Sequence, residues 1–193
     1  MKKTDILKNY IEKNNGILLT SDVVNMNINK QYIRILCDEN YIEKISRGVY
    51  VKKGKNLNDF FLLQQRYKKG IFSHNTSLYF YHLTDRTPLK YDLTFDSKTR
   101  LHDNTINAHY VKNEFFNIGI CSISFNDGTS VNVYDLERTI IDIIRNRNKI
   151  DKQILNNAIK EYMKRKDKNI VNLAKYAKIF NVEKVLKLYM EVL

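Results

Sequence analysis

The spacing of apolar residues changes twice along this chain, and that change restricts the fold more than any other feature of the sequence. From residue 6 to about 40, apolar residues recur at helical spacing, as in Ile6, Leu7, Tyr10 and Ile11. Between residues 91 and 133 short strand-like runs take over, and from residue 135 the helical period returns. This order predicts an α+β protein whose C-terminal part has a small, largely antiparallel sheet followed by helices.

The first 69 residues read as three short helices and a hairpin. The first helix ends at Asn14-Asn15-Gly16, Thr20 or Ser21 can cap a second one, and a third runs from about residue 30 to 40. Strands near 41–45 and 49–51 are joined by Ser46-Arg47-Gly48, in which Gly48 can take the positive φ of a tight turn. The pattern predicts a winged helix-turn-helix domain with a connector helix over 1–69, and a second domain over 70–193.

The second domain is expected to contain a short helix near 75–81 and strands near 91–95, 108–111, 118–125 and 130–133. Asn126-Asp127-Gly128 is a strong hairpin-turn signal between the last two strands. Four helices follow, near 135–147, 151–165, 169–179 and 183–193.

The chain is strongly basic, with a net charge of +12 from 33 basic and 21 acidic residues. Residues 1–69 carry 14 basic and 7 acidic side chains and residues 135–193 carry 14 and 8, so the excess lies at both ends. Such a charge favours a polyanionic partner, although lysine-rich codon usage can also produce it. Net charge alone therefore does not indicate a function, and a sequence motif is needed in addition.

The expected location is the cytoplasm. Two distant cysteines, Cys37 and Cys121, offer neither a disulfide framework nor a CxxC site. The N-terminal residues lack the apolar core of a signal peptide, and no run of apolar residues is long enough to span a membrane, so no membrane partner is expected.

The outward face of the third helix has the chemistry of major-groove recognition. Gln31 can pair with adenine, Arg34 with guanine, and Lys30 can meet phosphate. Lys44, Arg47 and Lys52, in and beside the hairpin, are candidates for DNA backbone contacts, with Arg47 the strongest. The alternatives are a solvated helix face that contacts protein and a hairpin that is lysine-rich for solubility alone.

Three strings of this sequence resemble the AbiEi antitoxin family of type IV, abortive-infection toxin-antitoxin systems. Ile45 to Tyr50 is similar to the family's "RGxY" end of the winged helix, and Ile71 to Tyr79 resembles its "ISHxSAL" entry to the second domain. Val133 to Asp142 resembles the "ERTIxD" helix. The strings occur in the family's order and spacing, although Ser77 stands where alanine is usual and residues 96–115 match nothing in it.

The resemblance implies a protein with two roles in phage defence. The winged helix would bind operator DNA and repress transcription of its own operon. The second domain would counteract a nucleotidyltransferase-like toxin without forming a stable complex with it. Ser73, His74, Glu137, Arg138 and Asp142 stand in the matching strings and are the antitoxicity candidates.

Each of these residues also has a structural explanation. Ser73 can cap the next helix, and adjacent Ser and His residues rarely make a productive nucleophile and base pair, so catalysis is not expected there. Arg138, Asp142 and Arg145 share a helix face and can form an exposed ion-pair ladder worth a few tenths of a kcal/mol per pair.

The alternative function is an enzyme, either a nuclease or a nucleic-acid-modifying activity in the second domain. Asp92, Asp96 and Glu114, with Lys98 or Lys112, could be arranged around Mg²⁺, but acidic residues at strand edges and turns are common. His74, His82, His102 and His109 have no metal-ligand spacing, so neither a metal nor a cofactor is expected.

A second basic patch is expected near the end of the helix at 151–165. It consists of Lys160, Lys164, Arg165 and Lys166. A solvated helix face is the ordinary explanation of such a run. The functional alternative is a second contact with DNA or RNA, between which the sequence does not choose.

Overall fold

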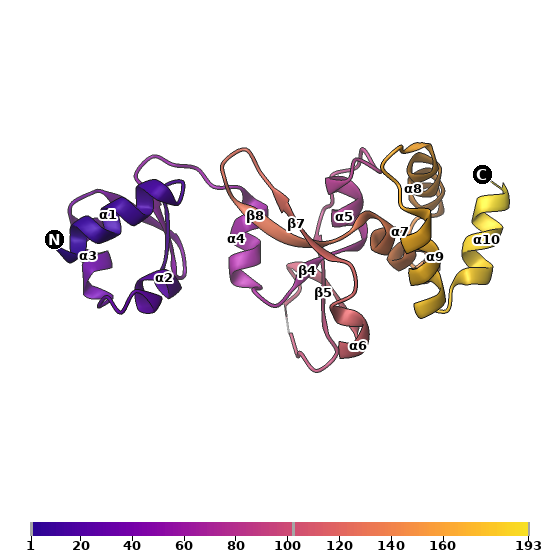
Figure 1. Cartoon of the computed structure of the whole chain (residues 1–193), viewed down its shortest axis with the longest axis horizontal. Helices are drawn as coiled ribbons and strands as arrows, with labels where there is room; N and C mark the ends of the chain where they lie inside the picture. Colours follow the sequence, from indigo (N-terminus) through magenta and orange to yellow (C-terminus); the bar gives the residue numbers. More distant parts are fainter. Residues whose placement is uncertain (1, 102, 193) are drawn as a thin grey trace. The chain divides into compact units, whose positions relative to one another are not determined.

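The computed structural model describes residues 2–101 and 103–192 and confirms an α+β protein. A three-stranded antiparallel sheet lies near the N-terminus, a mixed five-stranded sheet follows it, and helices form the C-terminal part (Figure 1). The chain divides into two compact units: 1–68 with 124–131, and 69–123 with 132–193. Residues 124–131, which contain the predicted Asn126-Asp127-Gly128 turn, therefore belong to the first unit. No helix in the described part of the chain is both long and apolar enough to cross a membrane.

The first unit begins with three helices and three strands. They are α1 (Lys3–Lys13), β1 (Ile17–Leu19), α2 (Thr20–Asn25), α3 (Gln31–Asp38), β2 (Ile42–Ser46) and β3 (Val49–Lys52), followed by α4 (Asp59–Arg66). The strand order is β1-β3-β2, with both pairs antiparallel. Only a two-stranded hairpin is predicted from the sequence. The short apolar run Ile17–Leu19 adds a third strand because it pairs with Val49–Val51 of β3.

Apolar residues spaced one helical turn apart on the three helices form the core of this unit, together with residues of the strands. Leu7 and Ile11 of α1, Val23 of α2, and Ile33 and Leu36 of α3 are buried against Leu18 and Ile42 of the strands. Gly48 joins β2 to β3 with a φ of +79°, as the turn signal predicts. The start of α2 differs from the expectation: Asp22 Oδ2, rather than Thr20 or Ser21, accepts the backbone N–H of Leu19 at 3.0 Å.

The second unit is built on the five-stranded sheet. Its strands are β4 (Ile71–Phe72), β5 (Tyr91–Asp96), β6 (Ile106–Val111), β7 (Ile120–Ser124) and β8 (Ser130–Tyr134), in the order β6-β5-β4-β8-β7. The expectation of a largely antiparallel sheet is wrong, because β5 pairs with β6 and β4 with β8 in parallel. The sequence between β5 and β6 carries no tight-turn signal, and β6 runs parallel to β5 instead of forming a hairpin with it.

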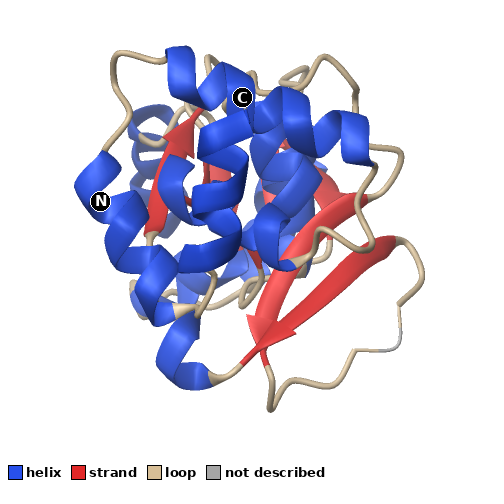
Figure 2. Cartoon of the chain, turned by 90° about the vertical axis from the view of Figure 1, so that its right-hand side faces the viewer, coloured by secondary structure: helices blue, strands red, loops and turns tan. Residues whose placement is uncertain are grey.

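Helices accompany this sheet, and those after residue 135 form the C-terminal part (Figure 2). They are α5 (His74–Phe80), α6 (Asn113–Phe116), α7 (Leu136–Arg145), α8 (Lys152–Lys164), α9 (Ile170–Ile179) and α10 (Glu183–Val192). The four predicted C-terminal helices are confirmed to within about two residues at each end. Three of them start where side chains cap them: Asp135 for α7, Asp151 for α8 and Asn169 for α9.

Helix α7 is the centre of the second unit. Every residue from Leu136 to Ile144 is buried, and the apolar ones pack with α5, α8, α9 and α10 in a single core. A helix that is buried all round must place its polar side chains inside the protein. Glu137, Arg138, Thr139 and Asp142 are accordingly buried polar residues, and each needs a partner.

Candidate functional site

The outward face of α3 is open to solvent. The side chain of Arg34 is 88% exposed and lies 3.9 Å from Asp38, one turn further along the helix. Lys30 and Gln31 are exposed at the start of α3, where Asn29 Oδ1 accepts the backbone N–H of Gln31 at 2.9 Å. Because the ion pair between Arg34 and Asp38 is exposed and long, it holds Arg34 only weakly and leaves its guanidinium available to a partner.

Sequence reasoning missed one residue of this face. Ile35, beside Arg34, is 39% exposed, so α3 presents an apolar side chain among its polar ones. An apolar contact is what the methyl group of thymine offers in the major groove. Once the core positions of α3 are assigned to Ile33 and Leu36, Ile35 is left outside, and that pattern could have identified it.

The three basic candidates of the β2–β3 hairpin lie in different environments. Lys44 and Arg47 are exposed, and Arg47 lies in the turn between the strands. Lys52 Nζ instead donates to Glu12 Oε1 at 2.7 Å, and the hydroxyl of Tyr41 donates to the same oxygen at 2.5 Å. These bonds lower the pKa of Glu12, and that carboxylate raises the pKa of Tyr41 to about 12. The charge of Lys52 is therefore already paired within the first unit.

Ser73 and His74, the first pair of antitoxicity candidates, form a hydrogen bond after all. Ser73 Oγ lies 3.0 Å from His74 Nδ1, because His74 takes a left-handed backbone with a φ of +47°. Ser73 occupies the N-cap position of α5, but its side chain makes no capping bond. Its Oγ accepts a hydrogen bond from Thr94 Oγ1 at 2.8 Å instead. Ser73 is fully buried, which makes it a poor nucleophile for any substrate in solution.

A second histidine, which sequence reasoning did not select, lies against this pair. The His109 ring stacks on His74 with centroids 3.6 Å apart, and His109 Nε2 lies 2.7 Å from Asp92 Oδ1. Burial lowers the pKa of His74 well below its usual value, and the neighbouring His109 lowers it further. His74 is thus neutral at physiological pH, and its Nδ1 can accept the proton of Ser73. The parallel pairing of β5 and β6 brings His109 to Asp92, and the sequence did not predict that pairing.

The expectation that Arg138 and Asp142 form an exposed ladder is wrong. Their side chains are 0% and 2% exposed, and Arg138 Nε donates to both carboxylate oxygens of Asp142 at 3.0 Å. Arg138 Nη1 also donates to the carbonyl oxygens of Phe115 and Ile118, both at 2.8 Å. The i,i+4 spacing is the same for an exposed and a buried pair, so only the tertiary packing distinguishes them.

The chain approaches α7 closely at Gly119, which lets those carbonyl groups reach Arg138. Gly119 has a φ of +77°, and a side chain there would meet Arg138 Cβ at 2.9 Å. The guanidinium is then covered by the rings of Tyr134 and Phe180, whose centroids lie 4.2 and 4.1 Å from it. Arg138 therefore joins α7 to the segment before β7 and to the end of α9.

Glu137 has a comparable structural role on another face of α7. Its Oε1 accepts hydrogen bonds from the hydroxyl of Tyr162 at 3.1 Å and from the backbone N–H of Asn169 at 2.7 Å. It is 6% exposed. Glu137 thus ties α7 to α8 and to the start of α9, and it does not reach a cavity with the other candidates.

His74 and Asp142 come from different strings of the sequence, yet they line the same cavity. The cavity has a volume of about 360 Å³, and its charged and titratable lining residues are His74, His109, Asp142, Arg145 and Lys149. Asp142 is neutralised by Arg138, and Arg145 Nη1 lies 3.4 Å from it. Arg145 and Lys149 are exposed at this cavity. The two exposed cations, Arg145 and Lys149, suit an anionic group, and we call this the α7 cavity.

The second basic patch is partly paired with acids. Lys164 Nζ lies 2.6 Å from Glu161, and Arg165 Nη2 lies 2.7 Å from Asp167. Arg165 Nη1 also donates to the carbonyl oxygen of Tyr81 at 2.8 Å, which ties the end of α8 to α5. Lys160 and Lys166 are exposed. The positive charge of this patch is smaller than the sequence suggests.

The acidic residues considered for a magnesium site are not brought together. Asp92 and Asp96 stand at opposite ends of β5, and Glu114 lies in α6 at 4.0 Å from Lys112. Within residues 2–101 and 103–192, no three His, Cys, Asp or Glu side chains are grouped so that they could hold a metal ion. His102 lies outside the described residues.

Comparison with known proteins adds no assignment. No protein-family model matches this chain, and neither does any curated protein. The functional interpretation therefore depends on the residues and contacts described above.

The half-buried His74, with its lowered pKa, predicts a specific pH dependence of stability. An unfolded histidine takes up a proton near pH 6.5, whereas folded His74 does so only at a much lower pH, so acid favours the unfolded state. The free energy of unfolding should fall as the pH drops from 7 to 5, and His74→Asn should reduce that fall. Asparagine suits the test because it tolerates the positive φ of this position.

The matched control is His82→Asn. His82 also has a positive φ, of +55°, but it is exposed. Urea unfolding at pH 7 and pH 5 should give this variant the pH dependence of the unaltered protein. Equal losses of stability in the His74 variant and the unaltered protein would show that His74 titrates normally.

Proposed function

We propose that this protein is a DNA-binding repressor and antitoxin of the AbiEi family. The observation that carries the proposal is the outward face of α3, where Gln31 and Arg34 are exposed on a helix whose other face is fixed in a core. Helix α2, the turn at residues 26–30 and α3 have the order of a helix-turn-helix, and the β2–β3 hairpin takes the place of the wing. In this proposal α3 enters the major groove.

The charge and the hairpin support DNA as the ligand. The net charge is +12, and the basic excess within residues 1–69 lies on the domain that carries α3. Arg47 and Lys44 are exposed in and before the hairpin turn, and in this proposal they contact the DNA backbone. Lys52 contributes less, because Glu12 already pairs with it.

The α7 cavity supports an antitoxin role for the second unit. His74 and Asp142, more than sixty residues apart in the sequence and both in strings that resemble the family, line this one cavity. Its exposed cations, Arg145 and Lys149, are the groups that a partner from solution could reach. We assign the opposition to a nucleotidyltransferase-like toxin to this cavity, without a stable complex between the two proteins.

A nucleic-acid-directed enzyme is the second candidate function. The His109–Asp92 pair favours it, because a carboxylate that orients an imidazole is a common arrangement in general-base catalysis. The buried Ser73 argues against a serine nucleophile in the same place. A cleavage assay with labelled RNA and DNA in the presence of Mg²⁺ distinguishes the enzyme from the antitoxin.

The DNA-binding proposal predicts that Arg34→Ala weakens binding to operator DNA by about 1–3 kcal/mol and leaves binding to random-sequence DNA nearly unchanged. The reason is that a contact with a base edge discriminates between sequences, whereas a phosphate contact does not. Fluorescence titrations of the full-length protein with both DNAs measure the difference.

Arg47→Ala provides the contrast. It should weaken both DNAs alike and make the slope of log K against log salt shallower by about 0.9, the value expected for one phosphate neutralised by a cation. Equal weakening of both DNAs by Arg34→Ala would remove that residue from the sequence-reading face.

The antitoxin proposal predicts that Arg145→Ala with Lys149→Ala impairs rescue of cells from the neighbouring toxin, expressed from an unrelated promoter. Both residues are exposed, and Arg138 still pairs with Asp142 when Arg145 is removed, so the double variant should fold and bind operator DNA normally. Colony counts with the full-length protein measure the rescue. Arg138→Ala and Asp142→Ala are unsuitable, because breaking a buried ion pair costs about 3–5 kcal/mol of stability.

Lys175→Ala on α9 is the matched control, since Lys175 is exposed and lies outside the cavity lining. It should leave rescue intact. Full rescue by the Arg145 and Lys149 double variant would place antitoxicity somewhere other than the α7 cavity.

A further inference from the structure

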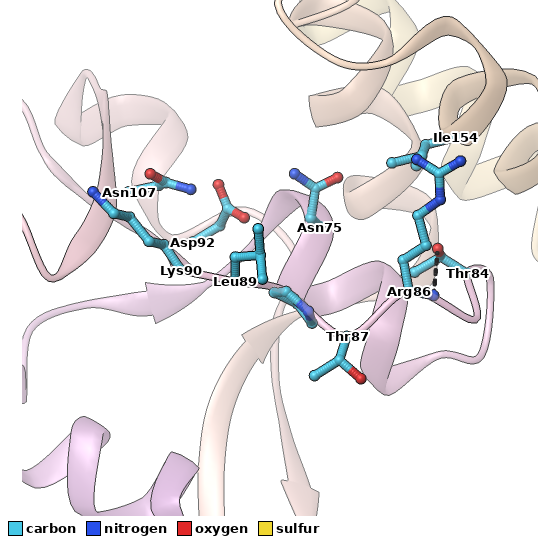
Figure 3. Close-up of a pocket in the computed structure, with 10 residues that line it drawn as sticks. Asn75, Thr84, Arg86, Thr87, Leu89, Lys90, Asp92, Asn107 and Ile154 are labelled. Carbon is cyan, nitrogen blue, oxygen red and sulfur yellow. Dashed lines mark hydrogen bonds between the residues drawn. The ribbon is translucent and has the colours of Figure 1, made fainter.

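A second cavity, of about 420 Å³, lies in the same unit and is not part of the α7 cavity. Asn75 from α5 and Asp92 from β5 line it, together with Asn107 from β6 and the segment from Thr84 to Lys90 (Figure 3). Figure 3 shows the side chains of Asn75 and Asp92 directed toward the same space, with Leu89 beside them. The volume is in the range that holds a small ligand.

Two residues that line this cavity each have a buried acceptor atom without a hydrogen-bond partner. The atoms are Asp92 Oδ2 and Asn75 Oδ1. The side chain of Asp92 is only 4% exposed, and its other oxygen, Oδ1, is taken by His109 at 2.7 Å. A buried acceptor without a partner costs about 1–3 kcal/mol, more when it is charged, so this cavity favours a ligand that brings N–H donors.

The opening of the cavity is basic. Lys90 is exposed there, and Arg86, also exposed, lies 3.3 Å from Asp151. These cations disfavour a positively charged donor such as an amine or an arginine side chain. They favour a ligand whose donor end is uncharged and whose other end is an anion.

The remaining lining residues are the polar Thr84, Thr87 and Asn107 and three apolar ones. Leu89 is fully exposed, and Pro88 and Ile154 also line the cavity. Flat, apolar ring faces pack on such surfaces. The cavity therefore favours a ligand with N–H donors at one end, an anionic group at the other end and a flat ring between them. A nucleotide has these three features.

We propose that this cavity binds a nucleotide whose base carries an exocyclic amino group. The amino group donates to Asp92 Oδ2 and Asn75 Oδ1, the ring packs against Leu89, and the phosphate meets Lys90. Cytosine, adenine and guanine carry such a group, and uracil does not. The site is independent of DNA recognition by α3 and of the toxin.

The decisive comparison is CMP against UMP, titrated calorimetrically into the full-length protein. The two differ at ring position 4, where CMP has an amino donor and UMP has a carbonyl oxygen, and at N3, which is an acceptor in CMP and carries a hydrogen in UMP. The position-4 oxygen of UMP would face the carboxylate of Asp92. We expect CMP to bind at least about tenfold more tightly than UMP, since a site built to accept hydrogen bonds rejects an analogue without the donor. Equal binding of CMP and UMP, or no binding of either at millimolar concentration, would overturn the proposal.

Variants test the two ends of the ligand separately. Lys90→Ala should weaken CMP several-fold and leave cytidine, which has no phosphate, unchanged; Lys175→Ala should weaken neither. Asp92→Asn should bring CMP and UMP closer together, because the amide can donate to the UMP oxygen. If Asp92→Asn does not fold, the CMP to UMP ratio and the Lys90→Ala result still decide the matter.

Two further titrations identify the source of the nucleotide. A trinucleotide with an internal cytosine that binds more tightly than CMP indicates a strand of nucleic acid, and the reverse order indicates a free nucleotide. Inorganic phosphate that binds as tightly as CMP would show that the base is not recognised, and would contradict the proposal.

Discussion

The buried ion pair between Arg138 and Asp142 is the interaction on which the second unit depends. A guanidinium that is fully removed from water needs several partners, and Arg138 has a carboxylate, two carbonyl oxygens and two aromatic rings. These partners come from α7, from residues 115–118, from β8 and from the end of α9. One side chain therefore fixes the segments that surround α7.

This pair also determines which groups a ligand can reach. Asp142 lines the α7 cavity, but its negative charge is balanced by Arg138. The charges that a ligand meets in this cavity are therefore those of Arg145 and Lys149. The His109–Asp92 pair links that cavity to the second one, because His109 lines the first and Asp92 the second. Residues of β6 thus line both cavities, and its neighbour β5 contributes Asp92 to the second one.

Local signals predicted most of the elements, whereas long-range contacts escaped prediction. The helices after residue 135 follow from their apolar spacing and from the caps Asp135, Asp151 and Asn169. The burial of Arg138 does not follow from its sequence, because the carbonyl groups that satisfy it lie about twenty residues away. No turn signal in the sequence indicates that β5 pairs with β6 in parallel. The contact between His109 and Asp92 was therefore not predicted. The outward face of α3, by contrast, could be predicted from the helical spacing of its apolar residues alone.

The central claim is that the chain recognises DNA of its own operon, and DNase I footprinting of the full-length protein tests it most directly. We expect one discrete protected segment upstream of its own coding sequence at about 10⁻⁸ M protein and physiological salt, the usual range for specific sites. DNA of equal length from within the coding sequence should stay unprotected. Equal protection of both DNAs, or protection of neither, would contradict the account.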